Sequence, residues 1–121
     1  MKKNNIDIEE ELLQALSAYN QAKEDYDAAV NVAYTAEMAF QADRRAYSQA
    51  FYSYVRELGQ EALKREDAAR EKYYRSLNWA NQADLNKHFA LCKFKKAAKL
   101  YKKLQRKAEK QHSKKQPGGE E

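Results

Sequence analysis

Hydrophobic side chains recur at alternating intervals of three and four residues along most of this chain. A first row runs from Leu12 to Tyr54 and a second from Ala69 to Ala108. An average spacing of about 3.5 residues is the repeat with which two α-helices pack along a common seam. The members of the two rows are Leu12, Ala15, Tyr19, Ala22, Tyr26, Ala29, Ala33, Ala36, Phe40, Asp43, Tyr47, Ala50 and Tyr54, then Ala69, Tyr73, Ser76, Ala80, Ala83, Lys87, Ala90, Phe94, Ala97, Tyr101, Leu104 and Ala108; Asp43, Ser76 and Lys87 are the polar exceptions. The pattern predicts an all-α fold that is helical from about residue 7 to residue 111.

Alanine and aromatic rings dominate this seam in place of leucine. Small alanines let two helices approach closely, and a ring on the facing helix fills the remaining space, so the rows favour a long antiparallel hairpin. In such a pair the numbers of facing residues have a constant sum. A sum of 123 pairs Phe40 with Ala83 and centres the turn on Glu61 and Ala62. A sum of 130 also sets large against small but needs a longer turn around Arg65, so we prefer 123.

Few residues interrupt the helical pattern. Gly59 is the only internal glycine, and it suits the left-handed residue that often ends a helix. Asp7 suits the cap at the start of the first helix. An alternative break lies near residues 78–84, where Asn and Asp weaken helix propensity, and it would give three helices. We expect one helical domain over residues 1–111 and a disordered tail over residues 112–121.

The formal net charge of +5 hides two regions of opposite sign. Residues 1–71 carry 9 basic and 14 acidic side chains, whereas residues 72–121 carry 14 basic and 4 acidic ones. Lysine is a point charge without the fork that reads base edges, so lysine-rich helices favour sequence-independent contact with the phosphates of DNA or RNA. An acidic protein surface and a simple solvated helix face are the alternatives. The predicted anion-binding residues, named the basic arm, are Lys93, Lys95, Lys96, Lys99, Lys102, Lys103, Arg106, Lys107 and Lys110.

A second set of apolar side chains lies off the seam. Such a stripe predicts a surface for a protein partner or for a second copy of the chain, which would complete a four-helix bundle. A third helix packing back on the stripe is the alternative. The residues of this partner stripe are Leu13, Leu16, Val30, Tyr34, Met38, Tyr52, Val55, Leu85 and Phe89.

The sequence holds no recognisable catalytic motif. Glycine-rich phosphate loops, HExxH and CxxC are absent, and no residues cluster at metal-binding spacing. His88 and Cys92 lie four residues apart, but a nucleophile–base pair also needs an orienting group and a concave pocket. We therefore expect no enzyme, no cofactor and no metal. A single cysteine and the lack of any apolar stretch of about 18 residues favour a cytoplasmic protein away from membranes.

These observations favour a non-enzymatic helical binding protein. It would contact proteins through the partner stripe and an anionic partner, nucleic acid or a nucleoprotein complex, through the basic arm. Two alternatives stay open. One is an inhibitor from a phage or mobile element that occludes a host nucleoprotein machine, as anti-CRISPR proteins do. The other is a structural protein whose oppositely charged halves join copies into an assembly.

Overall fold

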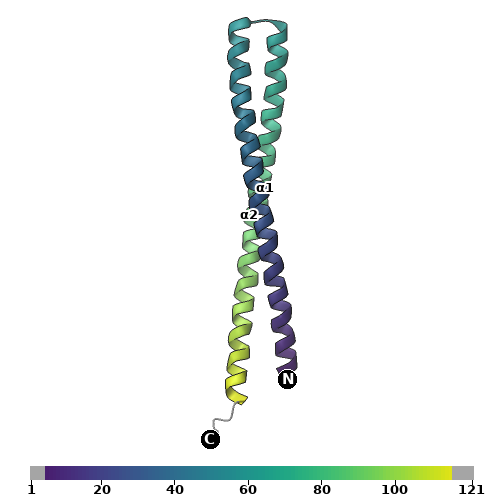
Figure 1. Cartoon of the computed structure of the whole chain (residues 1–121), viewed down its shortest axis with the longest axis vertical. Coiled ribbons are helices and arrows are strands. Elements are labelled where there is room, and N and C mark those ends of the chain that lie inside the picture. The colour runs from purple at the N-terminus through teal and green to yellow at the C-terminus, as the bar shows by residue number, and fades with distance from the viewer. Residues whose placement is uncertain (1–4, 116–121) are drawn as a thin grey trace. The chain divides into compact units, whose positions relative to one another are not determined.

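The fold is a helical hairpin. A computed structural model describes the backbone of residues 5–115 and the side chains of residues 7–113. Helix α1 spans Asn5–Glu57 and helix α2 spans Gln60–Lys115, and the described residues contain no strand. Figure 1 shows the two helices running in opposite directions on either side of a short connection. The all-α hairpin predicted from the 3.5-residue repeat is confirmed.

Helix α2 is continuous through the region where the sequence suggested a break. The prediction of a third helix beginning near residues 78–84 is therefore wrong. The side chains of Asn78, Asn81 and Asp84 all lie on the exposed face, whereas Ala80 and Ala83 between them are buried in the seam. Packing of the two alanines against α1 outweighs the weak helix propensity of the polar residues, as tertiary contacts commonly do.

The helix ends also differ from the prediction. Helix α1 begins at Asn5, so Asp7 lies in its first turn and not at its cap. The Asp7 carboxylate still stabilises the helix, because it lies near the positive end of the helix dipole. Helix α2 continues to Lys115, so residues 112–115 of the predicted tail are helical. The rest of that tail lies outside the described residues.

The turn is tighter than expected, and its left-handed residue is not the glycine. Leu58 has a φ of 50°, whereas Gly59 does not have a positive φ. The Leu58 amide donates to the carbonyl oxygen of Tyr54 at 2.7 Å, which closes α1. The Leu63 amide donates to the carbonyl oxygen of Gly59 at 3.0 Å, so Gly59 is the cap residue of α2. A leucine therefore carries the strained conformation that glycine would adopt freely.

Contacts between the helices group the chain into two compact units. Met1–Asp27 and Phe89–Glu121 form the terminal unit, and Ala28–His88 forms the loop unit. In the terminal unit the ring of Tyr19 packs between Phe94 at 5.3 Å and Tyr101 at 5.7 Å, measured between ring centroids. Tyr19 therefore faces α2 about midway between those rings, at residue 97 or 98.

The core of the loop unit is built from alanines. Ala36, Ala80 and Ala83 are buried together, with Phe40 packed against them. Farther along, Tyr73 lies between Phe40 and Tyr47, at ring-centroid distances of 5.5 Å and 5.4 Å. Tyr73 therefore faces α1 about midway between these two rings, at residue 43 or 44.

Both units share one register, and it differs from the predicted one. The numbers of facing residues sum to about 116–117, so both 123 and 130 are wrong. The displacement from 123 is about one heptad. In the observed register Tyr19 faces Ala97 and Tyr47 faces Ala69, whereas a sum of 123 pairs these tyrosines with Leu104 and Ser76. Large side chains again face small ones, because a pattern that repeats every seven residues matches itself after such a shift. The two-residue connection at Leu58 and Gly59 selects the register that the pattern leaves open.

Replacing Leu58 by glycine should stabilise the protein. Glycine adopts a positive φ without the steric penalty of a Cβ, so Leu58→Gly should raise the free energy of unfolding by about 1 kcal/mol. Thermal unfolding followed by circular dichroism measures the change. The control is Gly59→Ala, which should be tolerated because the nearest heavy atom to an added Cβ is the Glu57 carbonyl oxygen at 3.9 Å. Strong destabilisation by Gly59→Ala would show instead that Gly59 is the left-handed residue.

Enlarging the central alanine of the loop unit should be costly. Ala36 is fully buried between the helices, so Ala36→Leu forces the seam apart and should lower stability by about 1–3 kcal/mol. Chemical denaturation measures the loss. Ala42→Leu is the matched control, because Ala42 lies on the exposed face of the same helix. Equal stability of the two variants would contradict the close packing at Ala36.

Candidate functional site

The basic arm lies along the outer surface of α2 in the terminal unit. All nine of its side chains are exposed. None of them forms an ion pair with another residue that the structure describes. Glu109 is the only acidic residue between Lys93 and Lys110. The arm is therefore a strip of solvated positive charge that is not neutralised within its own helix.

The seam holds the arm in this orientation. Phe94 and Tyr101 stack against rings of α1, and Leu104 is buried. Because these residues occupy the inner side of α2, the lysines between them must lie on the outer side and flanks. The packing that stabilises the helix therefore also presents its charges to solvent.

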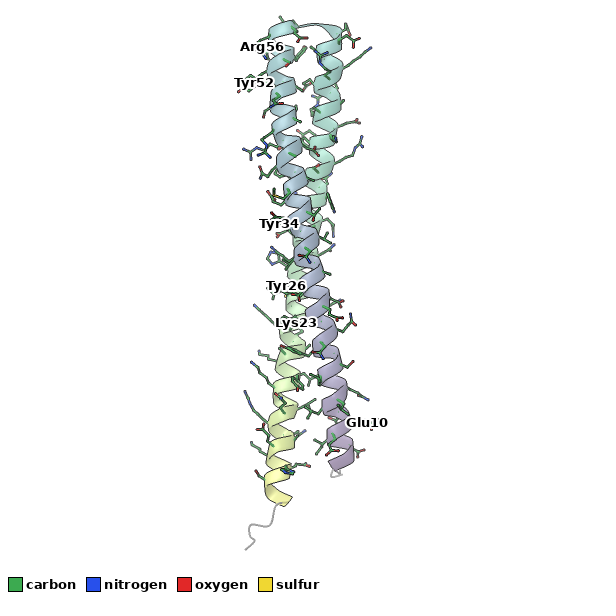
Figure 2. The ribbon with its side chains drawn as sticks, viewed as in Figure 1. Glu10, Lys23, Tyr26, Tyr34, Tyr52 and Arg56 are labelled. Carbon is green, nitrogen blue, oxygen red and sulfur yellow. The ribbon has the colours of Figure 1, made fainter. Side chains whose placement is uncertain are left out.

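An acidic stretch of α1 accompanies the arm in the same unit. Residues 7–27 carry seven acidic side chains and a single base, Lys23. Figure 2 labels Glu10 and Lys23 on α1. The two helices of the terminal unit therefore carry opposite charge, so an anion that approaches the outer face of α2 is attracted whereas one that approaches α1 is repelled. The seven acids are Asp7, Glu9, Glu10, Glu11, Glu24, Asp25 and Asp27.

The residues of the partner stripe are divided between the two units. The terminal unit holds Leu13, Leu16 and Phe89, and the loop unit holds the other six. Within the terminal unit, the register places residue 89 opposite α1 near residue 27, far along the helix from Leu13 and Leu16. Apart from Leu16 and Val30, which are half-buried, the stripe residues are exposed. Within the terminal unit, Phe89 therefore does not share one surface with Leu13 and Leu16.

Two parts of the stripe line shallow depressions in the loop unit. Val30 and Tyr34 border an open groove of about 520 Å³ whose far side is formed by residues of α2 that include Asp84. Tyr52 and Val55 border a second depression, and Figure 2 shows Tyr34 and Tyr52 on the outside of α1. Both depressions are open and mix polar with apolar side chains, so neither resembles an enclosed ligand pocket.

His88 makes its described contact with a carboxylate. Its Nε2 atom lies 3.5 Å from Oδ2 of Asp84, whose Oδ1 atom is 3.3 Å from Nζ of Lys87. Cys92 is exposed. Asp84 and Lys87 also border the open groove of the loop unit, and the His88 side chain is exposed.

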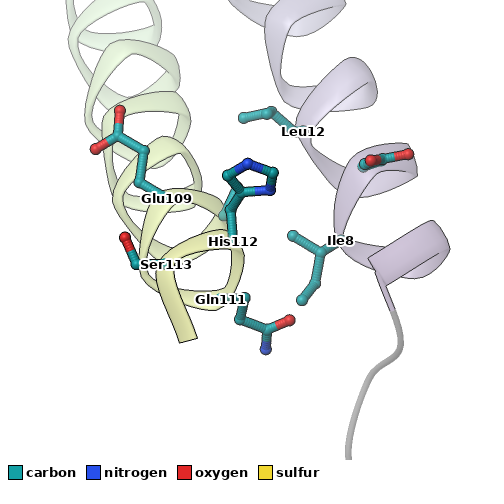
Figure 3. Close-up of a pocket in the computed structure, with 8 residues that line it drawn as sticks. Ile8, Leu12, Glu109, Gln111, His112 and Ser113 are labelled. Atoms are coloured by element: carbon teal, nitrogen blue, oxygen red, sulfur yellow. The ribbon is translucent and has the colours of Figure 1, made fainter. Parts of the chain in front are cut away.

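An open cavity of about 560 Å³ lies where the helix ends of the terminal unit meet. Figure 3 shows Ile8 and Leu12 of α1 across from His112 of α2. Glu109 and Ser113 also line the cavity, so its wall includes a carboxylate, the imidazole of His112 and a hydroxyl. His112 and Ser113 are consecutive on a helix and therefore point in different directions, which is not the geometry of a nucleophile and its base.

A small polar cluster interrupts the seam of the loop unit. The Ser76 hydroxyl donates to the carboxylate of Asp43, and Ser76 is buried. Glu66 is also buried, with its Oε1 atom 3.9 Å from Nη1 of Arg70, and, in addition to desolvation, its nearby carboxylate raises the pKa of the Tyr47 hydroxyl. Stepping back three residues from Ala69 along the seam would have located Glu66, which the sequence analysis missed. The buried Ser76 hydroxyl and the buried Glu66 carboxylate each have a polar partner, as buried polar groups generally must.

The search for metal and membrane sites is negative for the described residues. They contain no group of three or more His, Cys, Asp or Glu side chains placed to hold a metal ion. Neither α1 nor α2, as far as each is described, has an apolar stretch long enough to cross a membrane.

Comparison with known proteins gives no relative. No model of a protein family, no curated protein and no solved structure matches this chain. Its function must therefore be inferred from its own residues.

Stability should decrease at alkaline pH in a way that depends on Tyr47. Desolvation in the seam, followed by the nearby Glu66 carboxylate, raises the pKa of Tyr47 above its ordinary value of 10.0. The stability that this shift contributes is fully present below pH 10.0 and is lost as the pH rises through the raised pKa of the folded state. Melting temperatures from about pH 8 upward should fall less steeply for Tyr47→Phe than for the unaltered protein. Tyr52→Phe, which removes an exposed hydroxyl, should retain the original slope; identical slopes for all three proteins would contradict the role of Tyr47.

Proposed function

We propose that this protein binds nucleic acid without sequence preference, through the basic arm of α2. The observation that carries the proposal is the strip of nine exposed cations without ion-pair partners among the described residues. Sequence-independent binding of nucleic acid rests mainly on cations that replace the counterions of phosphates.

The density of charge along the arm suits a phosphate backbone. Lys93 to Lys110 spans about 26 Å of helix at about 1.5 Å per residue. Nine cations over this length give about one positive charge per 3 Å, close to the spacing of about 3.4 Å per phosphate along one DNA strand. A small acidic ligand would be bound by a few cations that converge on one point, whereas these cations form an extended strip.

The side chains of the basic arm are suited to contacts with phosphates and not to recognition of particular bases. Eight of its nine residues are lysines, and Arg106 is the exception. Lysine lacks the bidentate fork that distinguishes guanine in the major groove, so these side chains contact phosphates of any sequence. The acidic stretch of α1 would hold the nucleic acid on the outer side of α2 by repulsion.

Neutralising the middle of the arm should abolish binding. For the unaltered protein we expect the logarithm of the affinity to fall with the logarithm of salt with a slope near −5 on a duplex, or about −4 on a single strand, as for about six neutralised phosphates. The variant with Lys99, Lys102, Lys103 and Arg106 all changed to Gln should show a much flatter slope and lose measurable binding at physiological salt. Fluorescence anisotropy with a labelled oligonucleotide measures both quantities, and circular dichroism checks that the helices remain.

A charge-matched control separates the arm from net charge. Arg44, Arg45, Lys72 and Arg75 are exposed in the loop unit, and changing all four to Gln removes the same amount of charge. This control should keep most of the affinity. The proposal is wrong if the unaltered protein binds no oligonucleotide at low salt, or if the arm variant binds as well as the control. If the arm variant instead loses only self-association in light scattering, the anionic partner is the acidic stretch of another copy.

A further inference from the structure

One aromatic ring of the terminal unit lies outside the seam, beside the basic arm. Phe89 is 57% exposed and makes no ring contact with a described residue. Phe94, five residues later, stacks on Tyr26 and packs at a tilt against Tyr19 inside the seam. Two phenylalanines on the same helix therefore have different environments, and only the half-buried Phe94 is explained by packing in the seam.

The position of Phe89 follows the heptad repeat of the lysines. Lys96, Lys103 and Lys110 follow it at intervals of seven residues, so all four share one face of the packed helix. Lys93 is four residues from Phe89 and therefore its neighbour on the next turn. An exposed ring thus stands at the start of a row of cations that continues for about 30 Å along α2.

We propose that the basic arm binds single-stranded nucleic acid, with the Phe89 ring as a platform on which one base stacks. This inference rests on the proposed function and narrows its substrate class. Proteins that hold single strands without sequence preference combine a basic track for the backbone with aromatic rings for the bases. In the described part of the terminal unit, α2 presents both, on one face.

The charge distribution argues against a duplex as the preferred ligand. The basic surface is a single helix wide, about 10 Å, and the acidic stretch of α1 is its neighbour in the same unit. A single strand offers one row of phosphates to such a strip. A duplex carries a second phosphate strand, which would receive little attraction from the strip, and its bases are stacked internally and cannot reach Phe89.

Substitutions at Phe89 distinguish stacking from apolar contact. Phe89→Leu keeps a large apolar side chain but removes the ring, and it should weaken binding of an oligothymidylate of about 15 nucleotides by roughly five- to a hundredfold. Phe89→Tyr keeps the ring and should restore the affinity. Leu100→Ala is the matched control, because Leu100 is 50% exposed among the same lysines and has no ring, so it should leave the affinity within about twofold.

A spectroscopic readout reports stacking directly. With Trp79 changed to Phe, a Phe89→Trp variant carries one tryptophan at the proposed platform. Its fluorescence should be quenched on binding, whereas the protein that retains Trp79 in the loop unit should change little. Binding of single-stranded DNA, single-stranded RNA and duplex DNA is compared in the same buffer, and either single strand should bind at least tenfold more tightly than the duplex.

The outcomes separate this inference from the proposed function. If the oligothymidylate binds, the arm variant with four Gln fails to bind, but Phe89→Leu retains full affinity, the basic arm is correct and the stacking platform is wrong. Duplex binding equal to or tighter than single-strand binding also overturns the inference. If the unaltered protein binds none of the three nucleic acids at low salt, both proposals are wrong.

Discussion

Close approach of two helices through alanine is the interaction on which this structure depends. A seam residue as small as Ala36 leaves space only for another small side chain or for a ring from a neighbouring layer. The aromatic side chains pack in that space, as Tyr73 does at a tilt between Phe40 and Tyr47. Since one side of each helix is committed to this packing, the lysines of α2 remain on the other side.

The sequence predicts the pairing of the helices but not their alignment. The spacing of the seam identifies the hairpin and the outward placement of the lysines, because both follow from a period of 3.5 residues. That period cannot distinguish registers that differ by seven. Nor does composition reveal that Leu58 adopts a positive φ while Gly59 does not, because this depends on where each helix stops. The continuous helix through Asn78 and Asn81 likewise reflects burial of Ala80 and Ala83, which propensity does not measure.

The candidate site was predicted in part. The nine cations of the basic arm lie where the sequence places them, since a surface helix position needs only the period. The partner stripe combines residues of both units, and the sequence alone does not reveal this division. Phe89 is an example. The sequence analysis counts it with the apolar partner stripe, whereas the heptad repeat places it on the same face of α2 as Lys96 and Lys103. Residues off the seam can be grouped into surfaces only once the structure shows which face of the helix each one occupies.

The two-residue connection has a mechanical consequence. The short loop fixes the register of the two helices, since the repeating layers of ring and alanine would also fit after a shift of seven residues. The hydrogen bond from Ser76 to Asp43 also favours the observed register, and the short loop keeps the helices from shifting by seven residues. Cleaving the backbone at this loop would leave two separate helices. Each could then pair in other registers, including with helices from other molecules.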